Sequence, residues 1–282
     1  MHRAQGRKPS PASRSRGHDM DWLHGIAGLF VGLMVGLTGV GGGSLMAPIL
    51  ILLFGVAPAT AVGTDLWFAA ITKSVGGTIH HRHGGPDGGP DYEVVKRLCL
   101  GSLPAALIML LILSQTHVEQ IKGGIVTMGL GFVLIATAVA MLLRGRFHRW
   151  ALARRVGTAD SFTRWQPALT VAAGALLGAM VTLTSVGAGA IGATLLLALY
   201  PIRMRMQRLV ATDIVHAVPL TLVAGLGHLW IGNVNSGLLL NLLLGSIPGI
   251  IIGSLLATRA SDRVLQPLLA VILAVVGWRL IA

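Results

Sequence analysis

Long stretches without a charged side chain dominate this sequence. Asp, Glu, Lys and Arg are absent from residues 22–64, 98–118, 123–143, 165–202 and 214–258. About 20 apolar residues suffice for one helix to cross a bilayer, so several of these stretches hold two segments. The pattern predicts five segments in each half: roughly 22–37, 44–54, 58–80, 97–113 and 121–143, then 165–183, 190–200, 208–230, 236–257 and 264–281. We therefore predict an all-α membrane protein.

Glycine-rich segments interrupt the apolar sequence at matching places in the two halves. The first contains Thr38, Gly39, Gly41, Gly42 and Gly43, and the second contains Thr184, Ser185, Gly187 and Gly189. A helix broken at membrane depth leaves backbone N–H and C=O groups that lipid cannot satisfy, so the break must be buried in protein or line a wet cavity. Matching breaks in two halves are typical of the binding site of a secondary transporter.

We expect the two breaks to bind an anion through backbone N–H groups at helix ends. The hydroxyl groups of Thr38 and Thr184 would be further donors. The alternative is that the glycines only let two helices cross closely. Ser185 stands where the first break has Gly39, and Ala188 where it has Gly42, which argues against an equal contribution of the two halves.

Further matches in the same order indicate that the chain is duplicated. Val-Gly-Thr-Asp at 62–65 matches Val-Ala-Thr-Asp at 210–213, and Gly-Ser-Leu-Pro at 101–104 matches Gly-Ser-Ile-Pro at 245–248. His80 and His228 follow the first match at equal spacing. We predict a two-repeat polytopic helical bundle with broken helices at the glycine-rich segments. The sequence leaves open whether the repeats are parallel or inverted.

Charge adds information about the ends of the segments. The net charge is +12, and many of the basic residues cluster in 1–19 and 144–164, next to apolar segments. This distribution follows the positive-inside bias and argues against nucleic-acid binding. We expect 1–19 to be a disordered basic cytoplasmic tail, 20–143 the first transmembrane repeat, 144–164 a basic linker loop and 165–282 the second repeat. Ten full crossings would put the two basic regions on opposite sides, so the topology stays open.

The third predicted segment carries an unusual set of polar residues on one face. Asp65, Lys73 and His80 fall within one arc of a helical wheel. A charge near the centre of a membrane helix costs about 2.5–3.5 kcal/mol on insertion scales, so Lys73 should face a cavity or a partner. Asp65 is about 12 Å away along the axis and does not pair with Lys73 directly. Lys73 is therefore an anion-binding candidate; a structural salt bridge to another helix is the alternative.

The second half repeats this face without its cation. Asp213 and His228 are kept, but Thr221 takes the place of Lys73. We expect both aspartates to handle a coupling ion or a proton, and Asp213 to be the better proton carrier because it lacks a basic neighbour. Both histidines belong to this coupling set.

Thr64 and Thr212, each before one of these aspartates, are substrate-binding candidates or polar caps near a helix start. The adjacent histidines 80, 81 and 83 lack the convergent spacing of a zinc site. The single cysteine, Cys99, provides no disulfide framework. We expect no metal, no cofactor and no catalytic residue.

The sequence resembles a known family at several of these motifs. Residues 36–48, 61–66, 71–74 and 245–253 are similar to the sulfite exporter TauE/SafE family, and the resemblance extends over about 22–281. It implies a multi-pass inner-membrane transporter for small anions, often of oxidised or organic sulfur.

Together these observations favour a secondary transporter or exporter of a small anion across the cell inner (cytoplasmic) membrane. The leading substrate class is a sulfur oxyanion or an organosulfonate. The expected partners are this substrate and the lipid bilayer; homo-oligomer formation stays open, and no nucleic acid is expected. The alternatives are an intramembrane enzyme and a non-transporting membrane assembly factor.

Overall fold

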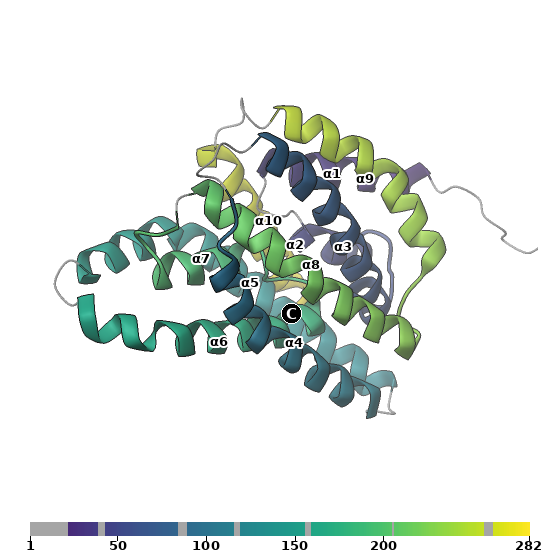
Figure 1. The fold of residues 1–282 in the computed structure, drawn as a ribbon. Helices are drawn as coiled ribbons and strands as arrows, with labels where there is room; N and C mark the ends of the chain where they lie inside the picture. Colours follow the sequence, from purple (N-terminus) through teal and green to yellow (C-terminus); the bar gives the residue numbers. More distant parts are fainter. Residues whose placement is uncertain are drawn as a thin grey trace, which may run out of the picture.

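The computed structural model describes residues 22–38, 43–83, 89–115, 119–155, 159–204, 206–256 and 262–282. Within these ranges the chain forms ten helices and no strand (Figure 1): α1 (Trp22–Thr38), α2 (Gly43–Leu52), α3 (Pro58–His83), α4 (Tyr92–Gln115), α5 (Glu119–Arg155), α6 (Ala159–Thr184), α7 (Ala190–Leu199), α8 (Met206–Ile231), α9 (Ser236–Leu256) and α10 (Asp262–Ile281). The predicted all-α class is confirmed.

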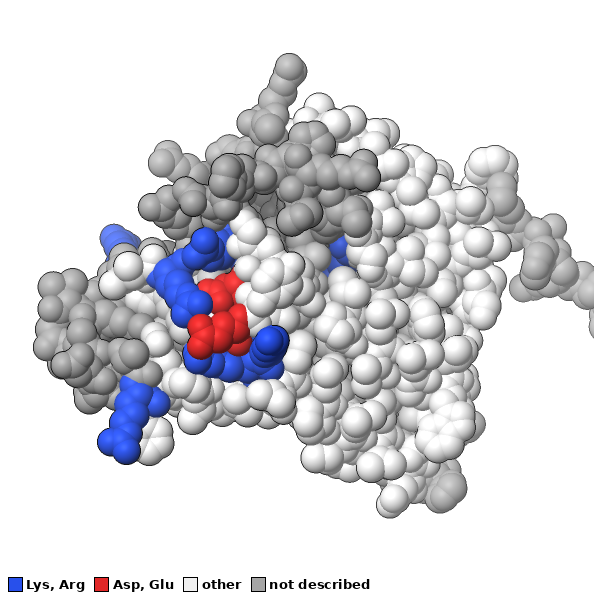
Figure 2. Space-filling view, in the orientation of Figure 1, with Lys and Arg blue, Asp and Glu red and all other residues white. Residues whose placement is uncertain are grey.

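The surface of the bundle suits lipid. Five described helices contain a stretch long and apolar enough to cross a bilayer, in α4, α5, α6, α8 and α9. Leu107 and Leu111 of α4 and Leu240 and Leu244 of α9 are all more than half exposed. Figure 2 shows a largely uncharged face on one half of the molecule. Soluble proteins rarely expose continuous apolar surface of this extent, so this uncharged face contacts the acyl chains of the lipid.

Glycines bring two pairs of helices into close contact. A Cβ atom placed on Gly28 or Gly32 of α1 would lie 2.2 or 2.3 Å from the carbonyl oxygens of Leu242 and Ser246 in α9. The residue numbers rise together along the contact, so α1 and α9 run parallel. Small residues allow this close approach. In lipid the hydrophobic effect does not drive helices together, so the van der Waals contacts of such close packing hold the pair.

The second close pair is α4 and α6. A Cβ atom on Gly174 or Gly178 of α6 would lie 2.3 or 2.2 Å from the carbonyl oxygens of Leu98 and Ser102 in α4. These helices also run parallel, and the contact is of the same kind as that between α1 and α9.

Helices α3 and α8 cross each other in opposite directions. The Trp67 indole N–H donates to the Gly225 carbonyl at 2.9 Å. Six residues further along α3, Lys73 meets Asp213, which lies near the start of α8. Residues 61–66 and 68–70 of α3 are all buried. The charged residues Asp65, Lys73 and Asp213 are therefore held inside protein, as the cost of exposing them to lipid requires.

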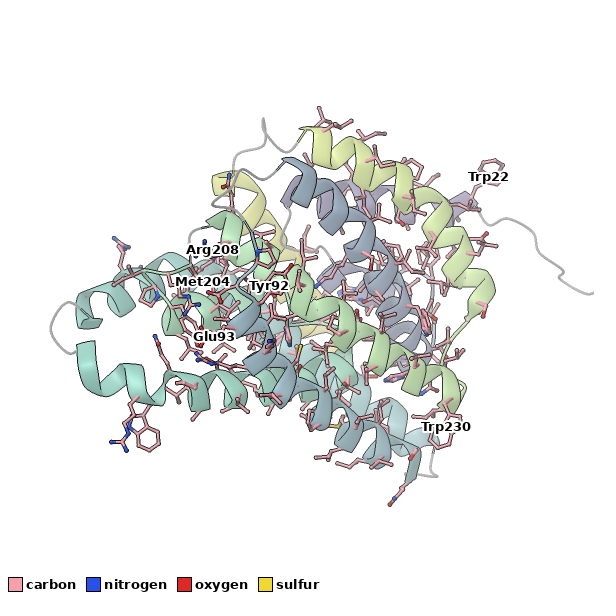
Figure 3. The ribbon with its side chains drawn as sticks, viewed as in Figure 1. Trp22, Tyr92, Glu93, Met204, Arg208 and Trp230 are labelled. Carbon is pink, nitrogen blue, oxygen red and sulfur yellow. The ribbon has the colours of Figure 1, made fainter. Side chains whose placement is uncertain are left out.

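An ion-pair network joins the starts of α4 and α8. The Arg203 guanidinium, in the turn before α8, contacts Asp91 at 2.5 Å and Glu93 at 3.1 Å, and Arg97 pairs with Glu93. Asp91 also accepts from the Val94 N–H at the start of α4, as a helix N-cap does. Figure 2 shows basic atoms on two sides of the acidic ones, and Figure 3 shows Glu93 near Arg208 and far from Trp22 and Trp230.

The basic linker predicted at 144–164 is mostly helical, which corrects that prediction. Helix α5 continues to Arg155 and α6 begins at Ala159, so both helices extend well beyond the predicted segments, away from the rest of the bundle (Figure 1). Arg, Ala and Leu are good helix formers, and a cluster of like charges on a solvated face does not by itself end a helix. Helix α4 likewise begins at Tyr92, before the predicted 97.

Candidate functional site

The break between α6 and α7 is a turn in which two residues have positive φ. Ser185 has φ 58° and Gly187 has φ 118°, the region that side chains disfavour. The Thr184 hydroxyl accepts from the Val186 N–H at 3.2 Å and donates to the Met180 carbonyl at 2.7 Å. The hydroxyl predicted to meet substrate is therefore engaged with the backbone of the break itself.

The start of α7 is buried and has no side-chain cap. Gly189 occupies the N-cap position without a side-chain hydrogen bond. A Cβ atom on Gly192 in the first turn would lie 3.0 Å from Oδ1 of Asp213. The Asp213 carboxylate thus lies beside the positive end of the helix dipole, a position that favours an anion.

Asp65 occupies a similar position beside the other short helix. Its Oδ2 accepts a 3.3 Å hydrogen bond from the Ala47 N–H in α2. The Ser185 hydroxyl neighbours the same carboxyl group but lies outside hydrogen-bond geometry, and Oδ1 of Asp65 has no hydrogen-bond partner among the described residues. The carboxyl group therefore connects α2, α3 and the α6–α7 break.

Lys73 interacts with both aspartates. Its Nζ is 4.0 Å from Oδ2 of Asp213, and it also interacts electrostatically with Asp65. The expectation that Asp213 lacks a basic neighbour is wrong, because the two residues lie on antiparallel helices and only the fold brings them together. At 4.0 Å the contact is longer than a direct hydrogen bond, so the ammonium keeps donors for another acceptor.

The threonines next to the aspartates serve other helices. Thr64 accepts from the Asn235 N–H at 3.1 Å, just before α9, and Thr212 accepts from the Asp91 N–H at 3.0 Å, just before α4. Neither residue caps its own helix. Each threonine directly precedes an aspartate of the site. By accepting from a backbone N–H of another helix, each hydroxyl group holds the backbone beside that aspartate in place.

His228 is also engaged. Its Nε2 donates to the Thr182 carbonyl at 2.9 Å, and the amide of Asn233 lies 3.5 Å from Nδ1. Because both ring nitrogens already have partners, His228 is a buried structural contact between α8 and α6.

Several predicted residues lie outside the described part of the structure. These are Gly39, Gly41 and Gly42, together with the side chains of Thr38 and His80. Gly43 begins α2. No group of three or more metal-ligating side chains occurs among the described residues.

Comparison with known proteins assigns the chain to a family. The family model of the sulfite exporter TauE/SafE matches residues 24–280. The chain belongs to the sulfite exporter TauE/SafE family. It is also 39% identical over 267 residues to a probable membrane transporter protein, YjnA, of Bacillus subtilis (strain 168), covering 91% of this chain and 98% of that one. No solved structure matches it.

Family membership confirms the resemblance read from the sequence. This TauE/SafE protein is a multi-pass membrane transporter, and its apolar helices account for the bilayer as its environment. The charged residues buried along α3 and α8 therefore belong to a membrane transport protein, in which a buried charge is rare and costly.

Two site residues of this TauE/SafE chain escaped the sequence analysis. His216 lies one turn after Asp213 on α8, is fully buried, and interacts with Lys73. Arg144 of α5 is buried and interacts electrostatically with Asp213. The spacing of His216 from Asp213 was a usable signal, since residues three apart share a helix face. Arg144 gave no such signal, because in the sequence it is the first residue of a basic cluster and does not differ from its neighbours.

Proposed function

We propose that this TauE/SafE protein is a secondary transporter of a small anion, a sulfur oxyanion or an organosulfonate, and that Lys73 is its fixed counter-charge. The observation that carries the proposal is a buried ammonium that interacts with two aspartates without a direct hydrogen bond to Asp213. An anion with several oxygens can take up donors that the aspartates leave unused. The first turn of α7 is buried, and the buried residues Met46 and Ala47 lie near the start of α2, so backbone N–H groups are close by.

Charge balance supports coupling of the anion to a proton. With Asp65 and Asp213 ionised, they balance Lys73 and Arg144. An incoming anion adds negative charge to a buried site, which is costly unless a proton arrives with it. Protonation of Asp213 would release Lys73 from its ion pair and leave the ammonium to the anion. Asp65, bonded to the Ala47 N–H, would remain the ionised frame of the site.

We further infer that the two halves are inverted repeats. Gly28 and Gly32 meet α9 in the way that Gly174 and Gly178 meet α4. Thr64 binds the residue before α9 in the way that Thr212 binds the residue before α4. The corresponding helices α3 and α8 are antiparallel, which favours a symmetry axis in the membrane plane. Such repeats let access alternate around one central site.

For orientation, we favour a cytoplasmic position for the end that carries Arg203. Arg97 and Arg203 lie there in the ion-pair network, Arg208 lies near Glu93 (Figure 3), and Arg144 interacts with Asp213 near the start of α8. The positive-inside rule then supports insertion in the cytoplasmic membrane with this end inward. Trp22 lies at the other end (Figure 3), so a cytoplasmic tail at 1–19 is the competing arrangement. Labelling of a cysteine placed at Trp22 from either side of sealed vesicles separates the two.

Flux measurements on the purified protein test the proposed function. Proteoliposomes are loaded with sulfite, sulfate, an alkyl sulfonate or chloride, and efflux is followed with and without a proton gradient. We expect one sulfur oxyanion or sulfonate to move faster than chloride and to respond to the gradient. Vesicles inert to every anion would reject the proposal and favour an enzyme or an assembly factor.

A further inference from the structure

A buried histidine of the site has an unused ring nitrogen. Nε2 of His216 lies 2.9 Å from the Ser102 hydroxyl of α4, while Nδ1 is buried and has no hydrogen-bond partner among the described residues. Leaving a buried polar atom unpaired is costly, and native proteins rarely do so without a reason. The missing partner is the feature to explain.

The surroundings of His216 identify the kind of partner. Asp213 lies one turn before it on the same face of α8, and Lys73 interacts with both residues. Among the described residues, Asp65 on α3 and Arg144 on α5 are the other charged groups that interact with Lys73 or Asp213. A neutral imidazole carries one donor and one acceptor. If the Ser102 hydroxyl donates to Nε2, the hydrogen must lie on Nδ1, which gives the site a buried N–H without an acceptor.

We propose that the Nδ1–H of His216 donates to an oxygen of the transported anion, alongside Lys73, and that Ser102 selects the tautomer that allows it. This inference rests on the proposed function and adds a second binding group to it. An oxyanion has separate oxygens for the ammonium and the imidazole, so the pair recognises a sulfonate or sulfite group by shape as well as charge. Ser102 is a positioning residue, because it acts through the ring.

The arrangement occurs in only one half of the chain. Aligning Asp65 with Asp213 puts Phe68, a fully buried apolar residue, at the position of His216. Ser246, the match of Ser102, donates instead to the backbone carbonyl of Leu243. The chain therefore provides its own control: Ser246 has the same packing role against a glycine as Ser102 but no histidine to orient.

Two substitutions of His216 separate binding from packing. The amide nitrogen of asparagine can stand in for Nδ1, and that of glutamine for Nε2. His216→Asn thus keeps the donor toward the anion and loses the Ser102 contact, while His216→Gln does the reverse. If Nδ1 binds the anion, His216→Gln should raise KM about tenfold or more, as loss of a hydrogen bond to a charged group does, and His216→Asn should raise it less. A purely structural histidine predicts the opposite order.

The serines provide the second measurement, which stands even if a His216 variant fails to fold. Ser102→Ala should raise KM several-fold with little change in kcat, whereas Ser246→Ala should leave both unchanged. Binding of inorganic sulfite and sulfate to the full-length protein in detergent, by calorimetry, should follow the same order. Equal affinity in Ser102→Ala and the unaltered protein, or a better Gln than Asn variant, overturns the inference. If the unaltered protein transports no anion, the proposed function fails first, and the inference with it.

Discussion

Gly178→Ala would show whether the α4–α6 contact sets the position of the site. The added Cβ would lie 2.2 Å from the Ser102 carbonyl oxygen, and such contacts are essentially never below 3.0 Å. Because the atom in contact belongs to the backbone, α4 and α6 must move apart until the distance rises from 2.2 Å to nearly 3.0 Å. Overpacking of this kind costs about 1–3 kcal/mol. Because Ser102 moves with α4, its bond to His216 lengthens, and KM for the anion should rise with the loss of stability.

Two other glycines serve as controls, one with open space around it and one with a similar close contact. Gly145→Ala in α5 meets nothing within 4 Å, so it should be neutral or stabilise by up to about 1 kcal/mol through helix propensity. Gly32→Ala meets the Ser246 carbonyl oxygen at 2.3 Å and should cost as much stability as Gly178→Ala, with a smaller effect on KM. Unfolding free energies come from denaturant titration in mixed micelles. A Gly178→Ala protein within about 0.5 kcal/mol of the unaltered one would refute the packing argument.

Three further outcomes are expected. Lys73→Met should insert and fold but lose transport, and Lys73→Arg should be partial at best because a guanidinium has a different shape; normal flux in Lys73→Met would make the charge structural. Asp213→Asn should remove the response of flux to a proton gradient in vesicles, while Asp65→Asn should weaken substrate handling at every pH; a full gradient response in Asp213→Asn removes that residue from coupling. Gly187→Leu should block flux because φ is 118° there, and normal flux would show that the turn is not rigid.

The sequence was informative where local pattern decides the outcome. Uncharged stretches located the helices, and the cost of a charge in lipid correctly placed Lys73 in the interior. The contact between Lys73 and Asp213 was not predictable, because it joins two helices whose relative direction no local pattern encodes. His216 was missed although it shares a helix face with Asp213; only its contact with Ser102 was not predictable, because Ser102 belongs to α4, far away in sequence. The end of α5 was misplaced because charge was taken as a loop signal.

The two ends of the molecule differ in how salt acts on them. At one end Arg203 joins Asp91 and Glu93, and the side chains of Arg203 and Glu93 are 44% and 53% exposed. Just before α9 stands Asn235, an uncharged residue whose side-chain oxygen accepts from the Leu238 N–H and so caps that helix. Ions screen charges over about 8 Å at physiological strength, so added salt weakens the contacts of Arg203, whereas the Asn235 cap has no charge to screen. Ionic strength therefore acts on the contact that holds the start of α4 and not on the cap that holds the start of α9.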